Sequence, residues 1–410
     1  MSDDHILVVG AGHAAGQLAV SLRQGGHAGA VTLVGEEPMA PYQRPPLSKK
    51  YLAGELDAER LLLKPESFYA EADVNLMLGR RVQTVDVAAK TVALDDGSRA
   101  SWDKLVFATG SRVRTLGVPG ESLPGVHYLR TAADVDAIRG EFATAKRLVI
   151  VGGGYIGLEV AAVAVGHDID VHLVEAQSRL LSRVVSPDIS DFYHRVHADA
   201  GVRIHLDCGV SGFEGSDCVS AALLNDGGRL EADLVIIGIG VVPNVELAQE
   251  AGLDCDNGIL VDGHCKTSHD DVYAIGDCCN HPNPVLGRRL RLESVPNALE
   301  QAKAVAATLS GTPTEYAQVP WFWSDQYDLK LQIVGLTDGY DQTVVRGDLH
   351  SRQFACFYLK QGRLIAVDAV NSPREFLFSK PAVAAGARIP ADVLSDPSQS
   401  LKDAAQTWPA

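Results

Sequence analysis

The sequence lacks the features that mark membrane, secreted and nucleic-acid-binding proteins. No apolar run approaches the roughly 18 residues that a membrane-spanning helix needs. The first residues lead directly into the apolar stretch Ile6–Val9, without the basic start and cleavage site of a secretory leader. The formal net charge of −16 disfavours binding to nucleic acids, because such a protein repels polyanions. We therefore expect a cytoplasmic protein with no membrane and no nucleic-acid partner.

The seven cysteines form none of the patterns that cysteine chemistry needs. Their odd number and irregular spacing favour free thiols, and no pair has Cys-x-x-Cys spacing. Cys278 and Cys279 are adjacent, which suits neither a shuttling disulfide nor a tetrahedral metal site. His194 and His197 lie three residues apart with no thiol close to them in the sequence. We therefore expect no metal site.

The composition is that of a folded, globular chain. Its 410 residues are 46% hydrophobic and 21% charged, which gives enough apolar material for buried cores. A chain of this length is expected to form two or three domains.

The N-terminal segment has the pattern of a dinucleotide-binding unit, in which an apolar strand ends in a glycine turn and a helical stretch follows. Gly10 permits the tight turn, and Gly12 lets the backbone approach a pyrophosphate. The small residues Ala15 and Gly16 let the helix pack closely on the sheet, and its N-terminus presents free N–H groups to phosphate. Glu36, 24 residues after Gly12, is placed to accept hydrogen bonds from a ribose.

The same unit occurs a second time, starting at Gly152. Gly154 follows, and Ile156 and Gly157 open the helical stretch. Glu175 ends the next strand, 21 residues after Gly154. Two such units, each with an acid at the expected distance, are much stronger evidence of dinucleotide binding than a single glycine motif.

Glu175 also indicates which nucleotide the second unit binds. A carboxylate accepts hydrogen bonds from the free ribose hydroxyls of NAD but repels the additional phosphate of NADP. At about 4 Å and an effective dielectric constant of about 20, each charge pair costs about 4 kcal/mol, and less where solvent reaches it. We therefore predict a preference for NADH.

Each unit leads on to another apolar strand that ends in small residues. The first ends in Ala108, Thr109 and Gly110, and the second leads to Gly240. At such points a chain crosses between two nucleotide-binding domains. The predicted fold class is α/β with two Rossmann-like domains. Two dinucleotide sites imply one tightly held and one exchangeable cofactor, for which FAD and NADH are the natural pair.

Several longer runs extend this pattern along most of the chain. They are Tyr42–Lys49, Val149–Glu159, Thr267–Asp277, Glu293–Gln301 and Pro320–Gln326. In these runs the chain resembles the FAD-dependent NADH:ferredoxin reductases of bacterial oxygenase systems. The resemblance implies a glutathione-reductase-like architecture with an additional C-terminal α+β domain.

We expect the domain boundaries to follow these motifs. Residues 1–110 and 241–315 would form the two parts of an FAD-binding domain, 111–240 an NADH-binding domain, and 316–410 a C-terminal interface domain. In the last domain, antiparallel strands are predicted at Lys330–Leu336, Thr343–Asp348, Gln353–Lys360 and Arg363–Val370. No role is assigned to the tail from Pro390.

The resemblance also implies roles for residues around the flavin. Gly276 and Asp277 would bind FAD, and Ala274–Asp277 is expected to lead into a helix N-terminus. Arg44, Pro45 and Lys49 would lie beside the flavin ring, where Lys49 stabilises the anion that forms as hydride arrives. A solvated surface lysine is the alternative for Lys49.

Three further positions have both a functional and a structural interpretation. Glu159 would lie near the nicotinamide, or it is simply an acid that favours the first turns of a helix. The spacing of apolar residues predicts a helix over Val295–Leu309, whose start at Val295 and Pro296 would face the flavin. Trp321, near Trp323, would shield the flavin on the path of electrons, or it packs a domain junction.

The absence of cysteine from Glu37 to Ser67 decides between flavoprotein chemistries. Disulfide reductases and cysteine-dependent peroxidases carry their reactive cysteine in this region, so the electron acceptor must be external. The resemblance implies a 2Fe–2S ferredoxin that supplies an oxygenase, and favours a haem monooxygenase. The alternatives are an NADH-binding signalling flavoprotein like apoptosis-inducing factor and a flavin-dependent NADH oxidase.

A basic cluster offers a docking surface for an acidic ferredoxin. Arg288, Arg289 and Arg291 are the densest group of basic residues in the chain. We predict that they contribute to docking, and the alternative is a solvated loop.

Overall fold

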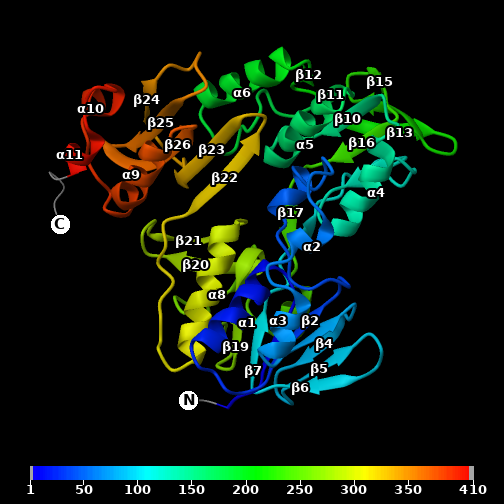
Figure 1. The fold of residues 1–410 in the computed structure, drawn as a ribbon, viewed down its shortest axis with the longest axis vertical. Helices are drawn as coiled ribbons and strands as arrows, with labels where there is room; N and C mark the ends of the chain where they lie inside the picture. The colour runs from blue at the N-terminus through cyan, green and yellow to red at the C-terminus, as the bar shows by residue number, and fades with distance from the viewer. Residues whose placement is uncertain (1–2, 406–410) are drawn as a thin grey trace. The chain divides into compact units, whose positions relative to one another are not determined.

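The computed structural model describes residues 3–405 and contains two compact units, each built from separate stretches of the chain (Figure 1). Unit 1 contains residues 3–44, 58–112 and 241–320. Unit 2 contains residues 45–57, 113–240 and 321–405. The stretch Pro45–Asp57, which carries part of the run Tyr42–Lys49, therefore belongs to unit 2.

Unit 1 is built on a parallel five-stranded sheet. Its three central strands are almost entirely apolar and buried, as expected for a parallel sheet that is covered on both faces. The strand order is β19 (Val272–Ala274), β7 (Lys104–Phe107), β1 (Ile6–Val9), β2 (Val31–Gly35) and β3 (Val74–Leu78).

Two helices pack side by side in unit 1, namely α1 (His13–Gln24) and α8 (Val295–Leu309) (Figure 1). The predicted bounds of α8 are confirmed. Ser294 caps this helix, because its hydroxyl oxygen accepts a hydrogen bond of 3.3 Å from the backbone of Asn297. Two smaller sheets complete the unit, formed by β4 (Val82–Asp86), β5 (Thr91–Leu94) and β6 (Arg99–Ser101), and by β18 (Ile259–Leu260), β20 (Cys279–Asn283) and β21 (Arg288–Arg291).

Unit 2 contains a second parallel sheet of the same kind. Its order is β12 (Arg203–His205), β11 (Asp170–Val174), β10 (Arg147–Val151), β16 (Leu234–Ile237) and β9 (Val126–Tyr128). The sheet is accompanied by three helices, which are α4 (Ala132–Phe142), α5 (Tyr155–Gly166) and α6 (Pro187–Asp199). The two sheets confirm the predicted pair of Rossmann-like cores.

The C-terminal part of unit 2 is an antiparallel sheet covered by α9 (Pro373–Ala384). Its order is β22 (Trp321–Gln326), β23 (Leu329–Gly335), β26 (Arg363–Val370), β25 (Phe354–Lys360) and β24 (Gln342–Gly347). The four predicted strands are present, with ends shifted by one residue at most. The strand that carries the two tryptophans was not predicted, because its apolar residues do not alternate with polar ones.

The segment after α9 is held by one arginine. Arg346 on β24 is buried, and its guanidinium donates hydrogen bonds to backbone carbonyls around the two short helices α10 (Ala391–Ser395) and α11 (Leu401–Ala405). The acceptors are Val393, Leu394, Asp396, Pro397 and Gln399. Part of the tail from Pro390 is therefore structural, and residues 406–410 lie outside the described part of the chain. Within residues 3–405, no helix is long and apolar enough to cross a membrane.

Asp368 on β26 is fully buried, and the hydroxyl of Tyr358 donates to its Oδ2 atom at 2.5 Å. Burial raises the pKa of Asp368 to about 7. Because the folded state holds this proton more tightly than the unfolded state, the contribution of Asp368 to stability is complete below about pH 4 and is lost as the pH rises through 7.

We therefore predict that Asp368→Asn weakens the pH dependence of stability. Between pH 4 and pH 8, the free energy of unfolding of the natural protein should fall by several kcal/mol relative to that of the variant. Each unit by which folding raises the pKa of Asp368 contributes about 1.4 kcal/mol. Thermal and denaturant unfolding of both proteins across this range measure the difference. Parallel stability curves would contradict the prediction.

Candidate functional site

The first glycine turn lies in unit 1 between β1 and α1. Gly10 has a φ of +116°, and a Cβ atom there would lie 2.2 Å from the carbonyl oxygen of Ala108, so the turn requires glycine. Gly12 is the N-cap of α1, with no side-chain cap among the described residues and no heavy atom beyond its chain neighbours within 4 Å of where its Cβ would be. The free N–H groups of this helix start fit the pyrophosphate of FAD.

The second turn, between β10 and α5 in unit 2, repeats this geometry. Gly152 has a φ of +112°, and a Cβ there would lie 2.4 Å from the carbonyl oxygen of Gly238. Gly154 is an uncapped N-cap with open space beside it, and a Cβ at Gly157 would lie 2.1 Å from the oxygen of Gly152. Ile156 is 38% exposed at the start of the helix. These residues fit the pyrophosphate of NADH in the same way.

Helix α4, in contrast to α1 and α5, is capped by side chains. Thr131 and Asp134 form a full capping box at the start of α4, which satisfies the helix donors within the chain. Comparison with α4 shows that α1 and α5 leave donors available for a ligand.

The two acids that follow the turns differ in their surroundings. The side chain of Glu36 is 73% exposed. The carboxylate of Glu175 is fixed by two backbone donors, Gly153 N at 2.7 Å to Oε2 and Gln177 N at 2.8 Å to Oε1. Each oxygen of Glu175 can accept a further hydrogen bond, which a ribose hydroxyl can donate.

The expected helix after Ala274 is absent, and this part of the sequence interpretation is wrong. Gly276–Cys278 form a single 3-10 turn, after which the backbone becomes extended and enters β20. The turn is fixed by side chains instead. Ser111 donates to Oδ2 of Asp277 at 2.8 Å, and Gly276 N donates to Oε1 of Gln301 at 2.7 Å. Neither partner was predicted, because both lie far from Asp277 in the sequence.

Other polar contacts in unit 1 surround the first turn. Arg44 pairs with Glu37 at 2.5 Å, and Thr109 donates from Oγ1 to the backbone oxygen of Asn244 at 2.7 Å. Burial, assisted by the charge of Arg44, lowers the pKa of His13 to about 4, so this imidazole at the start of α1 is neutral. The sequence interpretation missed His13, Glu37 and Asn244.

Lys49 and Glu159 meet inside unit 2. The ammonium of Lys49 lies 2.7 Å from Oε2 of Glu159 and donates to the carbonyl of Pro45 at 3.2 Å. The hydroxyl of Ser48 also donates to Oε2, at 2.5 Å, and that of Ser324 donates to Oε1 at 2.5 Å. The two residues that sequence reasoning assigned separately therefore form one buried ion pair.

The environment of Glu159 acts on its charge in two directions. Burial raises the pKa of its carboxyl group above the ordinary value, and Lys49, Ser324 and Ser48, which stabilise the ionised form, offset only part of this rise. Lys49 is thus not a solvated surface lysine. Ser48 and Ser324 stand within sequence runs that we had noted, but nothing in those runs indicated that both serines bind the same carboxylate.

Trp321 and Trp323 lie on the same face of β22, with ring centroids 5.6 Å apart. The ammonium of Lys380 lies 3.9 Å from the centroid of the Trp321 ring, and Phe376 packs against the same indole. Both partners are on α9. No local pattern in the sequence indicated this cation–π contact.

No two cysteines of the described residues form an accessible redox pair. All seven are free, and Cys265 and Cys279 are close enough for their thiols to interact. Both are completely buried, and burial raises the pKa of Cys279, which disfavours the reactive thiolate. Within residues 3–405, no group of three or more potential ligands could hold a metal ion.

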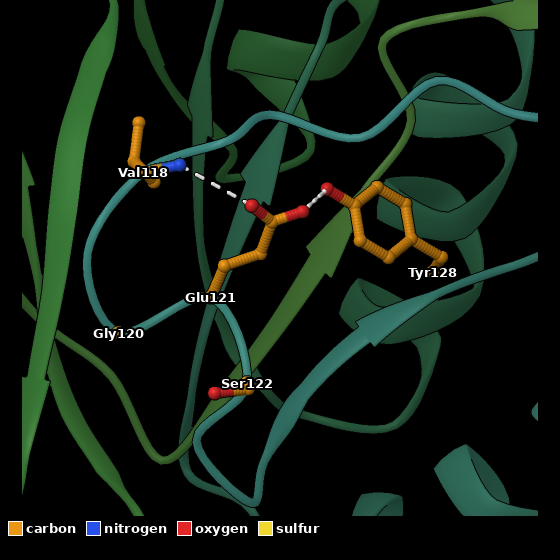
Figure 2. A pocket seen from close by; sticks show the side chains of 5 residues that line it. All are labelled: Val118, Gly120, Glu121, Ser122 and Tyr128. Carbon is orange, nitrogen blue, oxygen red and sulfur yellow. Dashed lines mark hydrogen bonds between the residues drawn. The ribbon is translucent and has the colours of Figure 1, made fainter.

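A shallow hollow of about 460 Å³ lies elsewhere in unit 2, at Val118–Ser122 and Tyr128 (Figure 2). Figure 2 shows that the carboxylate of Glu121 accepts hydrogen bonds from Val118 N, at 3.2 Å, and from the hydroxyl of Tyr128. These polar groups satisfy one another, and we assign no ligand to the hollow.

Comparison with known proteins agrees with the geometry of both turns. The family model described as pyridine nucleotide-disulphide oxidoreductase matches residues 4–302. This chain belongs to that family. A second model, described as reductase C-terminal, matches residues 321–405.

Individual members of the family are similar along nearly their whole length. Rhodocoxin reductase of Rhodococcus erythropolis is 44% identical over 97% of this chain and 93% of its own. Putidaredoxin reductase of Pseudomonas putida, which the sequence runs resemble, is 43% identical over 98% and 97%. The ferredoxin reductase subunit of a 5,5'-dehydrodivanillate O-demethylase from Sphingobium is 44% identical over 97% of both chains.

A solved structure shows the same fold. The covalent complex of putidaredoxin reductase with putidaredoxin matches with a TM-score of 0.97 and 43% identity, over 100% of this chain and 99% of that one. The protein is therefore an oxidoreductase of the FAD- and NAD(P)H-using class, as predicted, and a signalling role is not favoured. Unlike the disulphide reductases that give the family its name, it has no accessible cysteine pair among its described residues.

We predict that Glu175→Gln raises the use of NADPH. Glutamine keeps an acceptor for Gly153 N but removes the charge that repels the additional phosphate, so kcat/KM for NADPH should rise about tenfold, allowing for solvent screening. NADH kinetics, and the matched variant Glu36→Gln at the other turn, serve as controls. An unchanged ratio of NADH to NADPH use would contradict this role of Glu175.

Proposed function

We propose that this protein accepts hydride from NADH on bound FAD and passes single electrons to a 2Fe–2S ferredoxin that supplies an oxygenase. The observation that carries this proposal is the combination of two open nucleotide turns with the Lys49–Glu159 ion pair and, among the described residues, no accessible cysteine pair. The covalent complex of its 43% identical relative with putidaredoxin supports a ferredoxin as the acceptor. A cytoplasmic location, where NADH is supplied, is part of the proposal.

FAD, when bound, supplies a ring that takes two electrons as hydride and releases them singly. In unit 1, the proposed FAD ligands are the first glycine turn, the crossover strand, the carboxylates and the start of α8. They are Gly10, Gly12, Ala15, Gly16, Glu36, Arg44, Ala108, Thr109, Gly110, Gly276, Asp277, Val295 and Pro296.

In unit 2, the proposed ligands of NADH are the second glycine turn and the residues that face it. They are Gly152, Gly154, Ile156, Gly157, Glu159, Glu175 and Gly240. Pro45, Lys49 and Trp321 are proposed to contact the flavin ring. The positive charge of Lys49 would stabilise the negative charge that develops on the acceptor, and Glu159 would hold that ammonium in place.

The likeness of the sequence runs to putidaredoxin reductase favours a haem monooxygenase as the final electron acceptor. Relatives of equal identity have names that refer to different systems, among them an O-demethylase. Reconstitution with a haem monooxygenase and with an iron dioxygenase, each with its own ferredoxin, distinguishes the two classes by NADH consumed per product formed.

The three arginines of the predicted docking surface differ in their contacts within unit 1. Arg289 donates to two backbone oxygens, those of Val261 and Asn280, at 2.5 and 2.9 Å. Arg291 pairs with Glu293 at 2.7 Å. Both guanidinium groups stabilise the local structure, and Arg288, which is exposed, takes no part in these contacts. We propose that Arg288 is the first of the three to test for docking.

We predict that Arg288→Glu lowers kcat/KM for the ferredoxin several-fold at low ionic strength, because it places a negative charge on a surface that meets an acidic partner. The difference should vanish at high salt, where such interactions are screened. Arg99→Glu, on the separate sheet that contains β6, is the matched control. Equal salt dependence in both variants would refute the docking role of Arg288.

The proposed function is tested by anaerobic stopped-flow absorbance of the purified holoenzyme, mixed first with NADH and then with a 2Fe–2S ferredoxin. We expect rapid bleaching of the flavin and reoxidation by ferredoxin far faster than by oxygen. Reoxidation that is faster with oxygen would instead establish an NADH oxidase. A reduced flavin that ferredoxins fail to discharge would refute the reductase assignment.

A further inference from the structure

The contacts of Glu159 extend well beyond Lys49. Ser324, which donates to Oε1 of Glu159, accepts a hydrogen bond of 3.2 Å from Nε2 of Gln326. Oε1 of Gln326 lies 2.9 Å from Nε2 of His197, and Nδ1 of His197 lies 3.0 Å from the hydroxyl of Tyr327. We call this series of side chains the Tyr327–Glu159 chain.

The Tyr327–Glu159 chain runs from the surface to the buried ion pair, entirely within unit 2. Its inner members are at most 3% exposed, whereas Tyr327 is 37% exposed. Ser324 and Gln326 share one face of β22, Glu159 is on α5, and His197 is on α6. Tyr327 has a φ of +55° in the turn between β22 and β23, a conformation that glycine would adopt with less strain.

When Glu159 is ionised, only one arrangement of protons satisfies every contact in this chain. An ionised carboxylate only accepts, so Ser324 donates to Glu159 and must itself accept from the amide nitrogen of Gln326. The amide oxygen of Gln326 then faces His197, whose Nε2 must donate. The remaining Nδ1 accepts from Tyr327.

The state of the two outer groups agrees with this arrangement. Burial lowers the pKa of His197 to about 4, so its ring is neutral and carries one proton. Burial raises the pKa of Tyr327 to about 12, so its hydroxyl keeps the proton that it donates. All four donors therefore point toward Glu159, and aligned hydrogen bonds of this kind strengthen one another. Since an amide does not relay protons, the chain is a set of aligned dipoles.

We infer that Ser324, Gln326 and His197 are positioning residues that keep Glu159 ionised and so fix the ammonium of Lys49. This inference builds on the proposed function, in which Lys49 faces the reacting centre. It also gives His197 a role that excludes metal binding, because both of its ring nitrogens are used within the chain.

Other titratable groups face the same residues and would share in any change. Those near Glu159 are Lys49, Tyr155 on α5 and Tyr193 on α6. His194 lies near His197 on the same helix. A variant of the Tyr327–Glu159 chain substitutes none of these groups. Differences between variants in the titration of Glu159 therefore report on the chain itself.

The test is a pH titration of the protonation of Glu159 in the holoenzyme, followed by the infrared band of its protonated carboxyl group. Glu159→Gln identifies the band. We predict that Ser324→Ala raises the midpoint by about one to two pH units, because a hydrogen bond to a charged group is lost. Tyr327→Phe, at the exposed end, should raise it by a smaller amount in the same direction.

Two controls separate positioning from general loss of structure. Ser324→Thr keeps the hydroxyl and should restore the natural midpoint. Ser190→Ala removes a buried serine hydroxyl that donates instead to the carbonyl of Leu180, at 2.5 Å, and should leave the midpoint unchanged. Thermal unfolding and the flavin spectrum of each variant show that it is folded.

The inference is overturned if Ser324→Ala lowers stability without moving the midpoint, or if Ser190→Ala moves it equally. The titration requires no ferredoxin. A shifted midpoint in an enzyme that fails to reduce ferredoxin would therefore support the chain and refute the proposed function separately.

Discussion

The carboxylate of Glu159 is almost completely buried, and its negative charge must be balanced by an ion pair and hydrogen bonds. This is the constraint on which the packing of unit 2 depends. Removing a charge from water costs several kcal/mol, which a single ion pair seldom offsets. Glu159 therefore has three donors, from Lys49, Ser48 and Ser324. Ser48 and Lys49 come from the segment Pro45–Asp57 and Ser324 comes from strand β22, so the same contacts join this segment, helix α5 and strand β22.

The N-termini of α1 and α5 contrast with the carboxylate of Glu159, because no side chain of the described residues caps them. The chain caps α4 and α8 with its own side chains but leaves α1 and α5 with glycine N-caps. Unsatisfied N–H groups destabilise an isolated helix start, and a dinucleotide phosphate satisfies them on binding. At the two proposed sites, dinucleotide binding would therefore also stabilise the starts of α1 and α5.

The family name refers to disulfide chemistry that this chain does not support. Its cysteines are free, and Cys265 and Cys279, whose thiols interact, are completely buried. The indole of Trp321 on β22 has the ammonium of Lys380 over its ring, which is a cation–π contact between the C-terminal sheet and α9.

The sequence by itself determined the two Rossmann-like units, helix α8 and most of the C-terminal sheet. These depend on local patterns, namely glycine turns between apolar strands and helices, and a fixed spacing of apolar residues. It also placed Glu175 and Asp277 at their turns. It failed at Gly276–Cys278, where a long-range hydrogen bond to Gln301 fixes a short turn in place of a helix.

Only the tertiary structure decided how the polar residues combine. Ser48, Glu159 and Ser324 are separated by more than a hundred residues each, and no local pattern indicates that they meet. The same holds for His197, which the sequence offered only as half of a weak metal motif. Periodicity reports which face of an element is buried, but the partner of a buried polar group is fixed by how distant elements pack, and that information is not local.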